Sequence, residues 1–223
     1  MYLILLSFLI VTFIVFLKIF KSQKKISKNE IKGTIGEDEI FNLLSEKIKG
    51  KKLLFRNIYL PKNNGETTEI DILLVSPKGI FVFESKNYSG YILGDIDSYN
   101  WVQSFGKGKN NKFYNPILQN KNHIKALENL LNLKNNKLYY SFIVFGKNST
   151  LHQSIKGKFK ELPNTKIISI KDLSKEINYI NNLYSFKITD YQIKKIHSLL
   201  KPFENASAKT KIMHVKNLKK HYG

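Results

Sequence analysis

Residues 69–86 most constrain the fold, because two apolar, β-prone runs flank a Ser-Pro-Lys-Gly turn at residues 76–79. Proline at the second turn position and glycine at the fourth are typical of a tight turn, so the stretch predicts an antiparallel hairpin. A two-residue loop in this turn places Asp71 directly opposite Glu84 on the paired strand. A three-residue loop with Gly79 in a bulge would instead shift the register by one residue and turn Asp71 to the other face.

Three charged residues, Asp71, Glu84 and Lys86, fall inside this predicted sheet. Buried charge is costly unless it is paired or holds a metal. Directly opposed residues have Cβ atoms about 5 Å apart, and Lys86 shares the face of Glu84 because it lies two residues further on. Two adjacent carboxylates favour a hard divalent cation, Mg²⁺ or Mn²⁺, between them. The alternative is a structural Glu84–Lys86 charge pair on an exposed sheet face, with Asp71 belonging to a turn.

An aspartate followed by Glu-x-Lys on the next strand resembles the core of the PD-(D/E)xK nuclease superfamily. The surrounding motifs are similar to those of the nuclease-related domain (NERD) family and follow the same order over residues 31–146. The matching segments are Gly33-Thr34-Ile35-Gly36-Glu37, Glu69-Ile70-Asp71, Gly79-Ile80-Phe81-Val82, Glu84-Ser85-Lys86, Trp101 and Asn115-Pro116-Ile117-Leu118-Gln119.

The resemblance implies an α/β fold, with a restriction-endonuclease-like mixed sheet flanked by helices, and a metal-dependent phosphodiesterase. It implies Mg²⁺ or Mn²⁺ as the cofactor, with Asp71, Glu84 and Glu37 as metal ligands. Lys86 and Gln119 would complete the catalytic set. From the residues alone, Glu37 remains open, because an acid in the first turn of a helix also complements the helix dipole.

The apolar patterns elsewhere predict the remaining elements. Strands are expected at 53–60, 91–93, 101–103, 138–145 and 165–170, and helices at 30–49, 116–133, 172–181 and 190–200. Trp101 is interpreted as a core anchor rather than a base-stacking platform. His123 lies four residues after Gln119 on the same helical face. It is either a further site residue or a histidine satisfied by ordinary hydrogen bonding.

Residues 2–17 are almost wholly apolar, and residues 1–20 predict a single transmembrane anchor because a helix of this length spans about 26–30 Å. A cleaved signal peptide is the alternative, but no basic residue precedes the apolar run. Several lysines follow it in the basic linker at 21–29. The positive-inside rule then predicts a cell-membrane protein with its N-terminus outside and its globular domain cytoplasmic.

The net charge of +20 favours an anionic partner, either nucleic acid or a membrane surface, although biased codon usage could also enrich lysine. Arg56 is the only arginine, which argues against bidentate readout of bases. Lys107, Lys109 and Lys112 lie in a predicted mobile loop at 105–114, where they could follow a phosphate backbone. The absence of cysteine excludes disulfides and thiolate zinc sites.

The predicted organisation is completed by a nuclease-like domain at 30–146, an α/β extension at 147–204 and a basic tail at 205–223. The tail is expected to be disordered or weakly helical. The function predicted is a membrane-anchored, metal-dependent nuclease acting on DNA or RNA at the cytoplasmic face. The alternative is an inactive module that binds nucleic acid or a partner protein at the membrane. A scaffold role is a third possibility that no residue specifically supports.

Overall fold

The computed structural model describes residues 12–13, 15–16, 33–152, 155, 162–184 and 187–222. It separates into two units at residue 36, and the unit Gly36–Gly223 contains every labelled strand and helix. The predicted anchor at 1–20 and linker at 21–29 lie outside the described residues, apart from four residues of the anchor. Among the residues that the structure describes, no helix is long and apolar enough to cross a bilayer.

A mixed five-stranded sheet forms the centre of this unit, with the strand order β1-β2-β3-β7-β9. Its first three strands are antiparallel, and the last two run parallel to β3. The strands are β1 (Leu53–Pro61), β2 (Thr67–Ser76), β3 (Gly79–Lys86), β7 (Tyr139–Phe145) and β9 (Thr165–Ser169). All five were predicted from the apolar patterns, so the sequence signal for the central sheet is confirmed.

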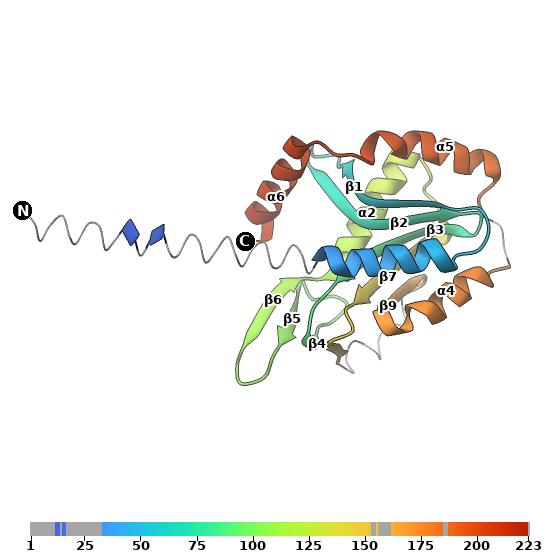
Figure 1. Ribbon diagram of the computed structural model, residues 1–223. Helices are drawn as coiled ribbons and strands as arrows, with labels where there is room; N and C mark the ends of the chain where they lie inside the picture. Colours follow the sequence, from blue (N-terminus) through green and yellow to red (C-terminus); the bar gives the residue numbers. More distant parts are fainter. Residues whose placement is uncertain are drawn as a thin grey trace, which may run out of the picture. The chain divides into compact units, whose positions relative to one another are not determined.

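Helices cover both faces of this sheet, which makes a three-layer arrangement (Figure 1). The helix of residues 33–47 and α4 (Leu173–Asn181) pack on one face, through Ile40, Leu44 and Ile177. The helices α2 (Pro116–Leu131) and α5 (Asp190–Leu200) pack on the other. Because the central strands are covered on both sides, they carry the continuous apolar runs that buried parallel strands require.

The β2–β3 turn has the predicted two-residue loop. Ser76 pairs with Gly79, and the register continues without a slip to Ile72 opposite Phe83. The bulged alternative is therefore wrong. The pairing of β2 with β3 ends at Ile72 and Phe83, so it stops just short of Asp71 and Glu84, the next residues away from the turn. Strand β3 continues to pair with β7 as far as Lys86. The two strands thus part where the charged residues begin.

A second, four-stranded sheet has the order β6-β5-β4-β8. It consists of β4 (Gly90–Leu93), β5 (Asn100–Ser104), β6 (Asn110–Tyr114) and β8 (Ser149–Leu151). The prediction of a loop over 105–114 is wrong in its second half, which forms β6. The chain can turn back because Gly106, Lys107 and Gly108 all adopt positive φ angles. Phe113 then packs edge-on against Trp101, which is fully buried in the core.

The C-terminal region belongs to the same core, since β9 pairs with β7 and Ile193 of α5 packs in the cluster that contains Leu127 of α2. Short 3₁₀ turns connect these elements at Asn136–Leu138, Ile170–Asp172 and Lys201–Phe203. The predicted tail contains the helix α6 (Ala208–Tyr222). The sequence left open whether this tail is disordered or helical, and the structure shows a helix.

Candidate functional site

The parting of β2 and β3 creates the site. At this point Asp71 Oδ2 accepts a hydrogen bond of 2.8 Å from the backbone N–H of Ser85. The side chain of Asp71 thus takes the place that a backbone partner would occupy in a continuous ladder. Asp71 and Lys86 line the same pocket, while the predicted direct pairing of Asp71 with Glu84 lies one step beyond the last paired residues, Ile72 and Phe83.

Glu84 is buried, with 1% of its surface exposed, and both of its carboxylate oxygens are bound. Lys86 Nζ lies 2.6 Å from Oε1, and His123 Nε2 lies 3.0 Å from Oε2. Burial alone would raise the pKa of Glu84, but the charge of Lys86 and the His123 contact outweigh it and hold this pKa below its ordinary value. The charge of Glu84 in turn outweighs burial at Lys86 and raises the lysine pKa. The pair is therefore ionised.

The pKa of Asp71 lies well above its ordinary value, because of burial first and the negative charge of Glu84 second. Lys86 and the Ser85 N–H act in the opposite direction but are weaker. The negative charge of Glu84 is thus offset by Lys86, whereas the ionised form of Asp71 is destabilised by the charge of Glu84. This imbalance is what an added positive charge would relieve.

The start of α2 supplies the far side of the site. Asn115 caps the helix by accepting a hydrogen bond from the N–H of Ile117 at 2.9 Å, as the sequence predicts. Gln119 and His123 follow one turn apart. Lys86 Nζ donates to Gln119 Oε1 at 3.1 Å, so this lysine joins the two elements β3 and α2.

Glu37 comes from the helix of residues 33–47, where Gly36 packs tightly against the end of β3. A Cβ on Gly36 would lie 2.9 Å from the Cβ of Asn87. The Glu37 carboxylate is hydrogen-bonded to Asn57 and lies 3.7 Å from Arg56. Burial is the largest effect on the pKa of Glu37, which is raised, and the charge of Glu84 adds to it. Glu37 therefore acts on the site through its charge.

A second polar group, not predicted from the sequence, adjoins the first. Tyr59 Oη donates to Glu69 Oε1 at 2.6 Å, and His214 Nε2 of α6 lies 3.8 Å from Glu69 Oε2. His214 Nδ1 lies 3.2 Å from the backbone oxygen of Thr67. Glu69 lies two residues before Asp71, and strand periodicity was the signal that could have placed it on the same face. His214 had no local signal, because the contact spans most of the chain.

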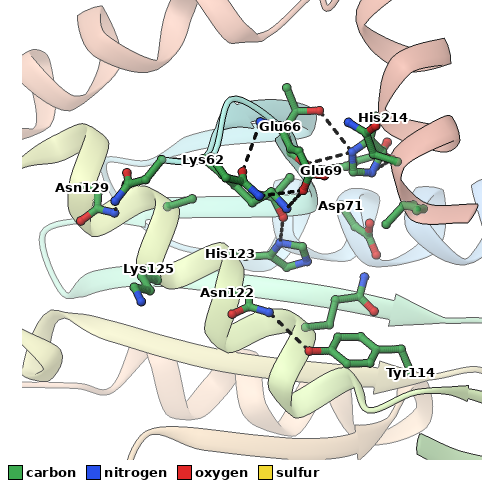
Figure 2. Close-up of a pocket in the computed structure, with 18 of the residues that line it drawn as sticks. Lys62, Glu66, Glu69, Asp71, Tyr114, Asn122, His123, Lys125, Asn129 and His214 are labelled. Atoms are coloured by element: carbon green, nitrogen blue, oxygen red, sulfur yellow. Dashed lines mark hydrogen bonds and ion pairs between the residues drawn. The ribbon is translucent and has the colours of Figure 1, made fainter. Parts of the chain in front are cut away.

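Thr67, Glu69 and His214 line a pocket of about 570 Å³ between β2, α2 and α6, together with Asp71, Lys86, Gln119 and His123. Figure 2 shows His123 and Asp71 directed into it, with His214 entering from the helix on the opposite side. The rim carries mainly polar side chains: Lys62, Asn63, Asn64, Glu66, Tyr114, Asn122, Lys125, Asn129 and Asn217. The lining thus brings lysines and the carboxylates of Glu66, Glu69 and Asp71 together around one pocket.

Residues 32–146 match the family model of the nuclease-related domain, NERD. The chain belongs to the NERD family. The matched region contains the β2–β3 hairpin and the start of α2, and therefore all of the site except the residues of α6. A curated relative of this NERD protein is an uncharacterised protein from Bacillus anthracis, 36% identical over 100 residues. That match covers 45% of the chain and 47% of the relative, so the NERD protein matches about half the length of this relative.

The structure brings four of the five predicted catalytic residues of this NERD protein around one pocket. Asp71, Lys86 and Gln119 line it, and Glu84 lies buried behind Lys86. Glu37 lies beside them without lining the pocket. The three predicted nucleic-acid-binding lysines do not line it either. They belong to the exposed β5–β6 turn and strand β6: Lys107, Lys109 and Lys112.

The carboxylates fit a hard divalent cation by their chemistry, because oxygen ligands of this kind bind Mg²⁺ and Mn²⁺. A cation near Asp71 and Glu84 would also offset the repulsion that raises the Asp71 pKa. As the side chains stand, no group of three or more histidine, aspartate or glutamate residues in the described part of the NERD protein is arranged to hold a metal. Both Glu84 oxygens have protein partners, so a metal would have to share Oε1 with Lys86 or displace it.

Proposed function

We propose that this NERD protein is a metal-dependent phosphodiesterase that cleaves DNA or RNA, with a core of the restriction-endonuclease type. The observation that supports the proposal best is the ionised Glu84–Lys86 pair beside Asp71, held by α2 at the floor of an open polar pocket. A pure binder of polyanions has no use for converging carboxylates, which repel phosphate. A hydrolase needs them to hold a cation.

The proposed ligands are Asp71 and Glu84, with Glu37 acting directly or through water. When bound, Mg²⁺ or Mn²⁺ would polarise the phosphodiester and lower the pKa of an attacking water. Lys86 would orient that water and stabilise negative charge on the phosphorus oxygens. Glu84 and Gln119 accept two of the three Nζ hydrogens, which leaves one for the water or the substrate.

Gln119 and His123 have supporting roles in this proposal. Gln119 fixes the Lys86 ammonium from the α2 side, and His123 fixes the second oxygen of Glu84. Both belong to one helical turn whose start is capped by Asn115. The catalytic geometry would therefore depend on the seating of α2 against β3.

The membrane location is also a proposal, based on the apolar run of residues 2–17 and the lysines that follow it. A helix over this run is long enough for one bilayer crossing. The lysine excess on its downstream side would place the nuclease-like domain on the cytoplasmic face.

The deciding experiment uses the purified full chain in a mild detergent. Mg²⁺ and Mn²⁺ are titrated calorimetrically into this protein and into an Asp71→Asn, Glu84→Gln double variant, with Lys121→Ala as an exposed control on α2. All three proteins are then assayed on labelled single- and double-stranded DNA and RNA. The proposal expects metal binding and cleavage in the parent and the control, and neither in the double variant.

A parent protein that binds neither cation would overturn the proposal. If it nevertheless bound nucleic acid with a steep salt dependence, the inactive binding module would be the better description. Cleavage that persists in the double variant would place the active site elsewhere.

A further inference from the structure

The helix α6 exposes its apolar side chains. Ile212 is 68% exposed, Val215 49%, Met213 48% and Leu218 41%. A surface helix normally turns its apolar stripe to the core and its polar residues to solvent. The arrangement in α6 is the reverse.

The face of α6 that meets the rest of the protein is polar. Thr210, His214 and Asn217 recur at the spacing of one helical face, and all three are buried or partly buried. His214 provides the contacts, to Thr67 and Glu69 on β2. The helix thus packs against the rest of the protein through its polar face, although its apolar side chains could have been turned to the same surface.

Lysines border the exposed apolar face. Lys209, Lys216 and Lys220 form a stripe beside Ile212, and Lys211 lies on the other side near Val215. All four are exposed. The segment 208–222 contains no acidic residue, so nothing within the helix neutralises them.

We propose that α6 is a membrane-contact element that lies on an anionic lipid surface. Ile212 and Val215 would enter the boundary between headgroups and acyl chains, while the flanking lysines bind lipid phosphates. A second copy of the chain fits poorly, because two such helices would repel each other through their lysines. Nucleic acid would satisfy the lysines but leave the apolar side chains in water.

The same helix forms part of the pocket, to which it contributes His214, Asn217 and Leu218. A lipid-bound α6 therefore fixes the pocket beside the membrane surface. The proposal does not depend on the pocket being catalytic, and it concerns a different part of the chain from the apolar N-terminal run.

The test uses the absence of cysteine, which allows a single dye to be placed on the full chain. Val215→Cys carries an environment-sensitive fluorophore, and Tyr184→Cys, at a residue that is 98% exposed, carries the same dye as a matched control. Each protein is mixed with vesicles of phosphatidylcholine alone or with added phosphatidylglycerol. The dye reports its own surroundings, so binding of the chain through another segment does not produce the signal.

A blue shift at position 215 in the phosphatidylglycerol vesicles, together with quenching by spin-labelled lipids and no change at position 184, is the expected result. Replacing Lys209, Lys216 and Lys220 by glutamine should reduce the shift at least about fivefold. Ile212→Ser should reduce it as well, with helical content unchanged by circular dichroism. An unchanged spectrum with both vesicles would overturn the proposal. A fluorescence shift at position 215 that occurs with single-stranded DNA but not with phosphatidylglycerol vesicles would also overturn it.

Discussion

His123 Nε2 lies 3.0 Å from Glu84 Oε2, and both side chains are buried. The other ring nitrogen, Nδ1, lies 2.7 Å from the hydroxyl of Thr68. Because a carboxylate can only accept a hydrogen bond, Nε2 carries the hydrogen of the contact with Glu84, and Nδ1 shares the second hydrogen bond with the Thr68 hydroxyl. Histidine and threonine thus form a continuous buried chain that orients the charged residue of the site.

Replacing His123 by alanine is expected to leave Glu84 Oε2 buried without a partner. The free energy of unfolding should fall by about 1–3 kcal/mol, the usual result of an unsatisfied buried polar group. If Glu84 binds the metal, the loss of this supporting contact should also weaken metal affinity or activity by about 10- to 100-fold. Urea unfolding and calorimetric metal titration measure the two effects.

Lys121→Ala is the control for this variant, since Lys121 is exposed on the same helix. It should change neither quantity. If His123→Ala lost stability but kept full metal affinity and activity, His123 would be a packing residue only.

The Glu84–Lys86 pair predicts a strong coupling energy. Lys86→Met alone should destabilise the protein by about 3–5 kcal/mol, because it leaves a buried carboxylate without its cation. Adding Glu84→Gln should recover much of that loss, because the remaining amide carries no charge. A double-mutant cycle by urea unfolding measures the coupling. Additive losses would show that the 2.6 Å contact contributes little to folding.

Asp71→Asn is expected to raise stability at neutral pH when metal is removed with EDTA. The Asp71 pKa is raised in the folded protein, so the folded state binds the proton more tightly than the unfolded state does. Stability of the parent therefore falls as pH rises from the ordinary carboxyl value towards the raised one. The Asp71→Asn variant lacks this loss of stability because asparagine does not titrate, and its side-chain oxygen can still accept the hydrogen bond from the Ser85 N–H.

The pH series provides the check on that prediction. Well below 3.8, the ordinary pKa of an aspartate, the parent carboxyl is protonated and the advantage of Asp71→Asn should disappear. Saturating Mg²⁺ should stabilise the parent and not the variant, because a ligand stabilises only the form that binds it. A variant that is less stable than the parent at pH 7 would contradict the prediction.

Local chemistry explains what the sequence could predict. The turn at 76–79 determines the β2–β3 register as far as Ile72 and Phe83, and Asp71 and Glu84 are the next residues beyond that pair. The capped helix start predicts where Gln119 lies on its helix, whereas its place in the site was predicted only from the family resemblance. The contacts of His123 with Thr68 and of His214 with Glu69 could not be predicted in this way, because they join residues far apart in the chain. Strand β6 was missed since its glycine-rich turn and lysines resemble a loop, and only packing on Trp101 reveals the strand.

Gly36→Ala should disturb the site without touching a charged residue. The added Cβ would lie 2.9 Å from Asn87 Cβ and 3.0 Å from Ser85 Oγ, so the helix must move away from β3. Overpacking of this kind costs about 1–3 kcal/mol, and the shift should displace Glu37, the next residue. Ser45→Ala, exposed on the same helix, is the control and should be neutral or slightly stabilising. Thermal unfolding and nuclease activity would be compared for both variants.

The β5–β6 turn is expected to supply electrostatic affinity for nucleic acid rather than chemistry. Lys107, Lys109 and Lys112 are exposed, and β6 leads from them to Tyr114 at the pocket rim. Replacing all three by glutamine should weaken binding equally for all sequences. It should reduce the slope of log affinity against log salt by about 2 for a single strand if each lysine neutralises one phosphate.

The control replaces three exposed lysines elsewhere on the protein, Lys134, Lys171 and Lys175, and changes the net charge by the same amount. Fluorescence anisotropy in EDTA measures binding without cleavage, so the result does not depend on catalysis. A specific role of the turn requires a larger slope change than in the control. Equal changes in both variants would mean that overall charge attracts the nucleic acid and that the turn does not guide the strand towards Tyr114.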